Sequence, residues 1–186
     1  MKKKNKNTGR LLFSHGGYRK LKSFQMATII YDFTVEFCRR YVSSRSYRTS
    51  EQMVQAARSG RQNIAEGCTD SGTSKKSELK LIGVARGSLE ELLLDYEDFL
   101  RQRNLPLWSK DSSKVKGIRA LAYKPDKSYK TYQSYLKDPE TAANCAVVLI
   151  NQANFLLDRQ MQSLEKDFLA KGGFTERLYR QRKKVL

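Results

Sequence analysis

The sequence predicts an all-α protein: an antiparallel up-down four-helix bundle, with a helical insertion between helices 3 and 4 and a short C-terminal helical suffix. Four long segments repeat apolar residues every three to four positions, which is the spacing of one face of a helix. No segment alternates polar and apolar residues for long enough to indicate a sheet, and the 186 residues include only 3 prolines. Four helices of this kind can bury one common apolar core.

The first two helices are expected from about Tyr18 to Val42 and from a cap at Thr49 or Ser50 to Gly67. The first helix is apolar on more than one face, so it needs a partner on each side, either within the bundle or from another subunit. The inward positions of the second helix are mostly small residues. They predict that a neighbouring backbone comes close to it.

The third helix is expected to begin after a cap at Thr73 or Ser74 and to end before Pro106, because the residue preceding proline disfavours helix. Residues 104–137 would make an unusually long loop. We therefore expect short helices within the insertion, in "KVKGIRALAY" and "KTYQSYL".

The fourth helix is expected to begin at Asp138, a good cap, with Pro139 in the first helical position, and to end at Gly172 and Gly173. These boundaries divide the chain into a basic N-terminal tail (1–17), a four-helix bundle (18–170, with the insertion 104–137) and a basic C-terminal suffix (171–186).

The charge is strongly basic: 36 Lys and Arg against 19 Asp and Glu, a net charge of +17. Residues 1–10 hold five bases and no acid, residues 171–186 hold six bases and one acid, and residues 101–137 hold ten bases and two acids. Such an excess attracts polyanions. We favour nucleic acid as the partner over the alternative of a surface that only keeps the protein soluble. The expected phosphate contacts are Arg39, Arg40, Arg45, Arg48, Arg58, Arg61, Arg180, Arg182, Lys183 and Lys184.

Aromatic residues alternate with lysines in the insertion. Trp108, Tyr123, Tyr129, Tyr132 and Tyr135 could stack bases while the lysines hold phosphates. Alternatively, short helices fold over the bundle with their tyrosines packed and their lysines solvated. We slightly favour the second interpretation.

The sequence argues against catalysis and against a metal site. Cys38, Cys68 and Cys145 are widely spaced, and His15 is the only histidine, so buried structural thiols are a better interpretation than zinc ligands. The acidic residues 90–98 spread around a helix, as in a solvated face. Neither GxxxxGK[ST] nor GxGxxG occurs, and we expect no cofactor. No apolar run is long enough to span a bilayer, so a cytoplasmic protein without a membrane partner is expected.

Small and polar residues are concentrated in the second and third helices. We interpret Gly60, Gly83 and Gly87 as positions where two helices approach closely. The polar residues beside them are expected to form a lock between helices 2 and 3, in preference to an active site. The residues of this structural motif are Gly60, Asn63, Glu66, Gly67, Gly83, Arg86, Gly87 and Ser88.

The motifs "NIAEG" (Asn63–Gly67) and "ARGSLEE" (Ala85–Glu91) resemble those of the 23S rRNA intervening-sequence four-helix bundle proteins. The accessory variability determinants of diversity-generating retroelements are similar. The likeness covers about 18–100 and 144–168, and "GGFTERLYRQR" resembles a suffix segment of a subgroup.

This resemblance implies a bundle that assembles with itself into a ring, typically a homopentamer, with a basic surface. In the retroelement branch it implies binding of nucleic acid and of a reverse transcriptase. We expect a non-enzymatic bundle that binds RNA or DNA. The alternative is a protein-interaction scaffold without intrinsic affinity for nucleic acid.

Overall fold

The computed structural model describes residues 17–42, 46–72, 74–172 and 174–185. Within these ranges the regular structure is helical and contains no strand. The elements are η1 (Tyr18–Lys20), α1 (Lys22–Tyr41), α2 (Tyr47–Asp70), α3 (Lys75–Gln102), α4 (Ser113–Leu121), η3 (Tyr129–Lys137), α5 (Pro139–Lys171) and α6 (Phe174–Val185). The predicted all-α class is confirmed.

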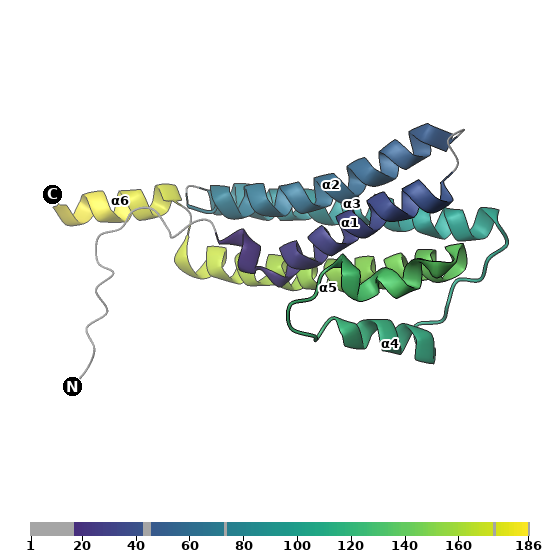
Figure 1. Ribbon diagram of the computed structural model, residues 1–186. Helices are drawn as coiled ribbons and strands as arrows, with labels where there is room; N and C mark the ends of the chain where they lie inside the picture. The colour runs from purple at the N-terminus through teal and green to yellow at the C-terminus, as the bar shows by residue number, and fades with distance from the viewer. Residues whose placement is uncertain (1–16, 43–45, 73, 173, 186) are drawn as a thin grey trace.

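Four long helices form the body of the molecule (Figure 1). Helices α1 and α3 run in one direction along the bundle, and α2 and α5 run in the other. Each packs against two of the others, in the cyclic order α1, α2, α3, α5. The outer side of α3 therefore points away from α1, and the insertion packs on the side formed by α1 and α5.

Two of the predicted helix starts have the expected caps. The Ser74 hydroxyl accepts a hydrogen bond from the Ser77 backbone N–H at 3.1 Å, and α3 begins at the next residue. The Asp138 carboxylate accepts from the Thr141 N–H at 2.8 Å, with Pro139 in the first position of α5. Helix α5 ends at Gly172, whose φ of 70° favours glycine.

Helix α2 differs from the prediction at both ends. It begins at Tyr47, so Thr49 and Ser50 lie in its first turn and not at its cap. It continues beyond Gly67 to Asp70, and Gly67 lies inside the helix, where it makes a close contact with α3.

The core follows the predicted apolar stripes, and its most aromatic part surrounds Phe37. The Phe37 ring lies 4.8 Å from the rings of both Tyr96 and Phe99, in edge-to-face geometry. The Tyr96 hydroxyl is buried and donates to the Thr34 hydroxyl at 3.0 Å. This hydrogen bond gives the buried hydroxyl of Tyr96 a partner.

The insertion is folded onto the bundle through α4 and η3, in agreement with the predicted short helices. The Leu136 carbonyl of η3 accepts from Tyr41 Oη at 2.7 Å and from Arg40 Nη1 at 3.1 Å. Part of the second apolar side of α1 is thereby covered within the same chain. None of the helices in the described ranges is long and apolar enough to cross a membrane.

Candidate nucleic-acid interface

The largest accumulation of positive charge in the described residues lies on the end of α3 and the insertion that follows it. Of the ten basic side chains in residues 101–137, nine are exposed and Lys127 is partly exposed. We call the outward side of this segment the insertion face. Its basic residues are Arg101, Arg103, Lys110, Lys114, Lys116, Arg119, Lys124, Lys127, Lys130 and Lys137.

The amphipathic character of α4 explains why these charges point outward. Val115 and Ile118 are buried against the bundle, which leaves Lys114, Lys116 and Arg119 on the solvent side of the same two turns. Helix α4 begins at a conventional cap, with Ser112 Oγ accepting from the Val115 N–H. Burial of apolar side chains therefore fixes the orientation of the basic ones.

Most aromatic residues of the insertion are packed and do not face solvent. Tyr132 is fully buried, and burial raises its pKa to about 12. Tyr129 and Tyr135 are half-buried, and Trp108 Nε1 donates to Glu140 at 2.7 Å. For these four residues the packing interpretation holds. Tyr123, which is 88% exposed, is the exception.

The predicted phosphate contacts at the end of α1 are partly neutralised. Glu36 accepts from Arg39 Nη2 at 2.7 Å and from Arg40 Nε at 2.6 Å. These hydrogen bonds lower the pKa of Glu36 to about 2. The cluster thus has a net charge of only one, although Arg39 and Arg40 remain exposed.

The predicted contacts on α2 have different environments. Arg48 and Arg58 are exposed, whereas the Arg61 guanidinium is half-buried and lies 4.3 Å from the centre of the Tyr31 ring. Arg61 thus packs against α1, and its charge is less accessible than the sequence suggested. Arg45 lies outside the described residues.

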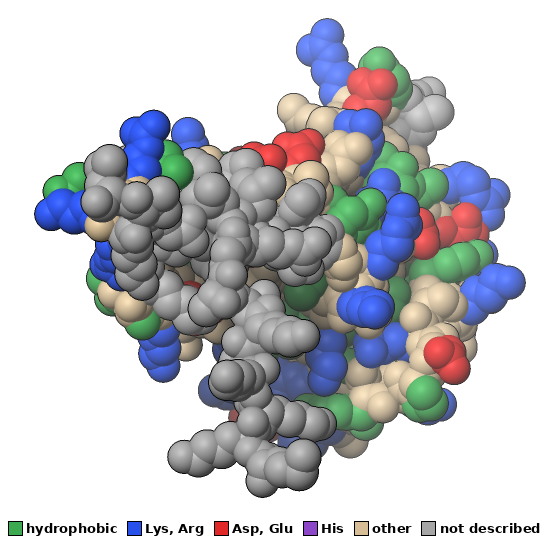
Figure 2. Space-filling model, turned by 90° about the vertical axis from the view of Figure 1, so that its left-hand side faces the viewer, with side chains coloured by type: hydrophobic (Ala, Val, Ile, Leu, Met, Phe, Trp, Pro, Cys, Tyr) green, Lys and Arg blue, Asp and Glu red, His purple; other side chains and the backbone are tan. Residues whose placement is uncertain are grey.

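Helix α6 carries the predicted C-terminal contacts beyond one end of the bundle (Figure 1). Arg180, Arg182 and Lys183 are exposed. Lys184 also lies in α6, but its side chain is not among those that the structure describes. Seen from the α6 end, Lys and Arg side chains are distributed over much of the visible face (Figure 2). The predicted residues therefore do not form one patch.

The glycines of the structural motif have two different environments. A Cβ on Gly60 would lie 2.8 Å from the Leu89 side chain, and one on Gly67 would lie 3.3 Å from the Glu78 carbonyl oxygen. At both positions α2 approaches α3 closely. A Cβ on Gly83 or Gly87 would meet nothing within 4 Å, because these glycines point away from the subunit core. Close approach at Gly83 and Gly87 within the subunit was therefore a wrong expectation.

The polar lock also joins different helices from those expected. Arg86 donates from Nε to Asp158 Oδ1 at 2.7 Å and from Nη1 to Glu90 Oε2 at 3.2 Å, and the hydrogen bond to Asp158 raises the pKa of Arg86. Asn63 instead bonds within its own helix, to the Ser59 carbonyl. The lock therefore connects α3 to α5.

The two remaining polar members of the motif take no part in this lock. Glu66 is exposed on α2, and Ser88 lines a shallow groove between α2 and α3. Arg86 lies on the side of α3 that faces α5, whereas Ser88, two residues further, lies on the side that faces α2.

None of the three cysteines forms a disulfide. Cys38 and Cys145 are buried and Cys68 is half-buried. Burial raises the pKa of Cys38 to about 11 and also raises the pKa of Cys145. A high pKa keeps these two thiols protonated and unreactive. The described residues contain no group of three or more His, Cys, Asp or Glu side chains able to hold a metal ion.

Sequence reasoning did not assign the basic residues of the insertion to the interface. The signal was present, since residues 101–137 have ten bases against two acids. What the sequence lacked was the orientation of α4 and η3, which places the apolar residues inward and leaves the bases in solvent.

The comparisons with known proteins identify one family. A family model described as "23S rRNA-intervening sequence protein" matches residues 19–105, a little under half of the chain, from η1 to just beyond α3. No curated protein and no solved structure matches the chain. The match contains both motifs on which the resemblance was based. Residues 19–105 are therefore similar to the 23S rRNA-intervening sequence protein family.

Proposed function

We propose that this protein is a non-enzymatic, cytoplasmic helical bundle that binds nucleic acid through its basic surfaces. The observation that carries this proposal is the insertion face, where residues 101–137 hold ten exposed or partly exposed bases against two acids, Asp111 and Asp126. The affinity arises from contacts to phosphates and depends little on sequence. The exposed bases of α6 add a second contact region.

Self-assembly into a ring, typically of five copies, is the second part of the proposal. The outer face of α3 supports it: Gly83 and Gly87 have open space above them, and Val84 and Leu94 are exposed on the same side. A small, partly apolar helix face of this kind suits close contact with another copy. By analogy with the retroelement relatives, the assembled ring serves as an accessory to a reverse transcriptase.

Light scattering of the pure protein, alone and with a short RNA, tests both parts. We expect a particle of about five monomer masses that gains the mass of the RNA at low salt and loses it at moderate salt. Each phosphate contact contributes roughly 0.7 to 0.9 to the slope of log affinity against log salt. A ring that ignores RNA would support the protein scaffold instead, and a monomer would contradict the assembly.

Reversing two charges tests whether the insertion face contributes more to RNA binding than the net charge of the protein does. Lys116→Glu combined with Lys130→Glu should weaken RNA binding and flatten its salt dependence. The matched control is Lys76→Glu with Lys80→Glu, which makes the same charge change at exposed positions of α3. Equal losses in the two variants would show that only net charge matters.

A further inference from the structure

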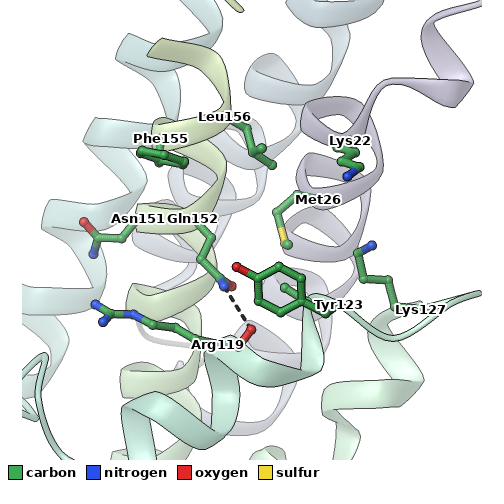
Figure 3. Close-up of a pocket in the computed structure, with 10 residues that line it drawn as sticks. Lys22, Met26, Arg119, Tyr123, Lys127, Asn151, Gln152, Phe155 and Leu156 are labelled. Carbon is green, nitrogen blue, oxygen red and sulfur yellow. Dashed lines mark hydrogen bonds between the residues drawn. The ribbon is translucent and has the colours of Figure 1, made fainter. Parts of the chain in front are cut away.

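A cavity of about 570 Å³ lies between α1, α5 and the turn that follows α4 (Figure 3). Its volume falls within the range of roughly 300–1,000 Å³ found for sites of small ligands. The bundle helices supply an apolar wall that includes Met26 and Leu156. The insertion supplies the opposite side.

Two large aromatic side chains are exposed at this cavity. Tyr123 is 88% exposed and Phe155 is 61% exposed, and both line it. Most tyrosines of the insertion are packed, so the exposure of Tyr123 is not a general property of this segment. Exposed aromatic groups that share a hollow are typical of binding surfaces.

The cavity is positively charged. Lys22, Arg119 and Lys127 line it, and none of the described residues that line it is acidic. In Figure 3 the Tyr123 ring lies at the centre of the view, with Lys22 and Lys127 on one side and Arg119 on the other. The guanidinium of Arg159 adds a further cation 5.9 Å from the centre of the Phe155 ring.

Hydrogen bonds hold the turn that carries Tyr123. Gln152 Nε2 of α5 donates to the Arg119 carbonyl at 3.3 Å, and the Tyr123 N–H donates to the Ala120 carbonyl at 3.2 Å. Arg119 Nη1 also donates to the Lys110 carbonyl at 3.2 Å, which fixes the direction of this side chain. The backbone from which Tyr123 projects and the side chain of Arg119 are thus held in place before any ligand arrives.

We propose that this cavity binds one unpaired nucleotide of a single-stranded nucleic acid. Its base lies against Tyr123 and Phe155, and its flanking phosphates contact Arg119, Lys127 and Lys22. Aromatic rings bind any base by stacking, and lysine and arginine hold the backbone. Bases within a duplex are already stacked and cannot enter. This inference rests on the proposed function and adds to it a preference for single strands.

Fluorescence anisotropy tests the inference, using labelled oligouridylate, oligothymidylate and a duplex RNA of equal length. The double variant Tyr123→Ala/Phe155→Ala should lose about tenfold or more in affinity for the single strands, the effect of one stacked base. Its affinity for the duplex should stay the same. Equal losses with RNA and DNA indicate recognition of the base, and a larger loss with RNA adds contact to the 2′-hydroxyl. The matched control is Tyr47→Ala, an exposed aromatic of α2 outside the cavity.

Three results would overturn the inference. If the double variant and the control bind single strands as well as the original protein, the cavity holds no base, although the proposed function stands. If the double variant loses affinity for an acidic peptide that competes with the oligonucleotide, the cavity is a peptide site. If the original protein binds no nucleic acid, both proposals fail. As a positive check, a 4-thiouridine oligonucleotide should crosslink to peptides containing Tyr123 or Phe155.

Discussion

Asn144 should contribute far more to stability than an ordinary surface amide of the same helix. Its side chain is 1% exposed. Its Nδ2 donates to the Pro106 carbonyl at 2.9 Å and to the Glu140 carbonyl at 3.0 Å, and its Oδ1 accepts from the Trp108 backbone N–H at 2.7 Å. Two of these bonds attach the start of the insertion to α5.

The magnitude follows from what Asn144→Ala leaves behind. A hydrogen bond contributes a net 0.5–1.5 kcal/mol or so, and a buried partner left unsatisfied costs about 1–3 kcal/mol. With two partners in a half-buried connection, we expect the free energy of unfolding to fall by about 2–3 kcal/mol. In a chain of this length each kcal/mol lowers the melting temperature by about 2–4 °C.

Urea denaturation followed by circular dichroism measures this loss in the free energy of unfolding. Tryptophan fluorescence shows whether the insertion is the part that is affected. Trp108 is the only tryptophan, so a red-shifted emission under native conditions would report detachment of the insertion. Asn151→Ala is the matched control: Asn151 lies two turns further along α5, is exposed, and bonds only within its helix, to Val147. That change should alter stability by no more than about 0.5 kcal/mol. If the two variants behave alike, or if the emission stays unchanged, the anchoring role of Asn144 is refuted.

Three further predictions concern the bundle. Gly60→Ala should destabilise the subunit by about 1–3 kcal/mol through overpacking. Gly87→Ala has open space at its Cβ and should raise the stability of the isolated subunit by up to about 1 kcal/mol. Equal effects of the two changes in urea titrations would contradict this. The pKa of Glu36 lies below its usual 4.5, at about 2, so its stabilisation is complete above pH 4.5 and is lost as the pH falls toward 2. Glu36→Gln should therefore flatten the dependence of the urea midpoint on pH in that window. Tyr96→Phe removes a buried hydrogen bond and should cost about 1 kcal/mol, while Tyr132→Phe should cost nothing, because its buried hydroxyl has no partner among the described residues; thermal melts would compare the two.

The fold could be predicted because a helix that buries one face repeats its apolar residues every three to four positions, and the sequence shows this repeat. Ser74, Asp138 and Gly172 also act locally, as caps and terminators, so their roles can be inferred without knowing the neighbours of each helix. The start of α2 was misplaced because Thr49 and Ser50 are good capping residues but capping preference is weak. Residues 46–49 are exposed, so no tertiary contact marks the start of this helix.

The candidate site was less predictable because it depends on which helices are neighbours. The partner of Arg86 is Asp158, 72 residues away on α5, and no local pattern reveals such a pair. Similarly, the cavity combines residues of α1, α5 and the turn after α4, so the exposure of Tyr123 follows only from the way α4 docks. The charge of the insertion was visible in the sequence, but the exposure of nearly all of its bases was not.

Assembly and the cavity together determine how affinity should depend on the length of a nucleic acid. The cavity lies on the α1–α5 side of the subunit, away from the outer face of α3 that we propose for contact with another copy. A ring would therefore present one cavity per copy, and a strand that reaches several would bind with an effective concentration in the millimolar range, gaining about 10²- to 10⁴-fold. Oligonucleotides too short to span two cavities should bind with single-site affinity, and longer ones should bind much more tightly. Gly87→Glu, which places a charge on the proposed contact, should abolish this length dependence while leaving the affinity for the shortest strand unchanged. A monomeric variant that keeps the full length dependence would show that one subunit carries several sites.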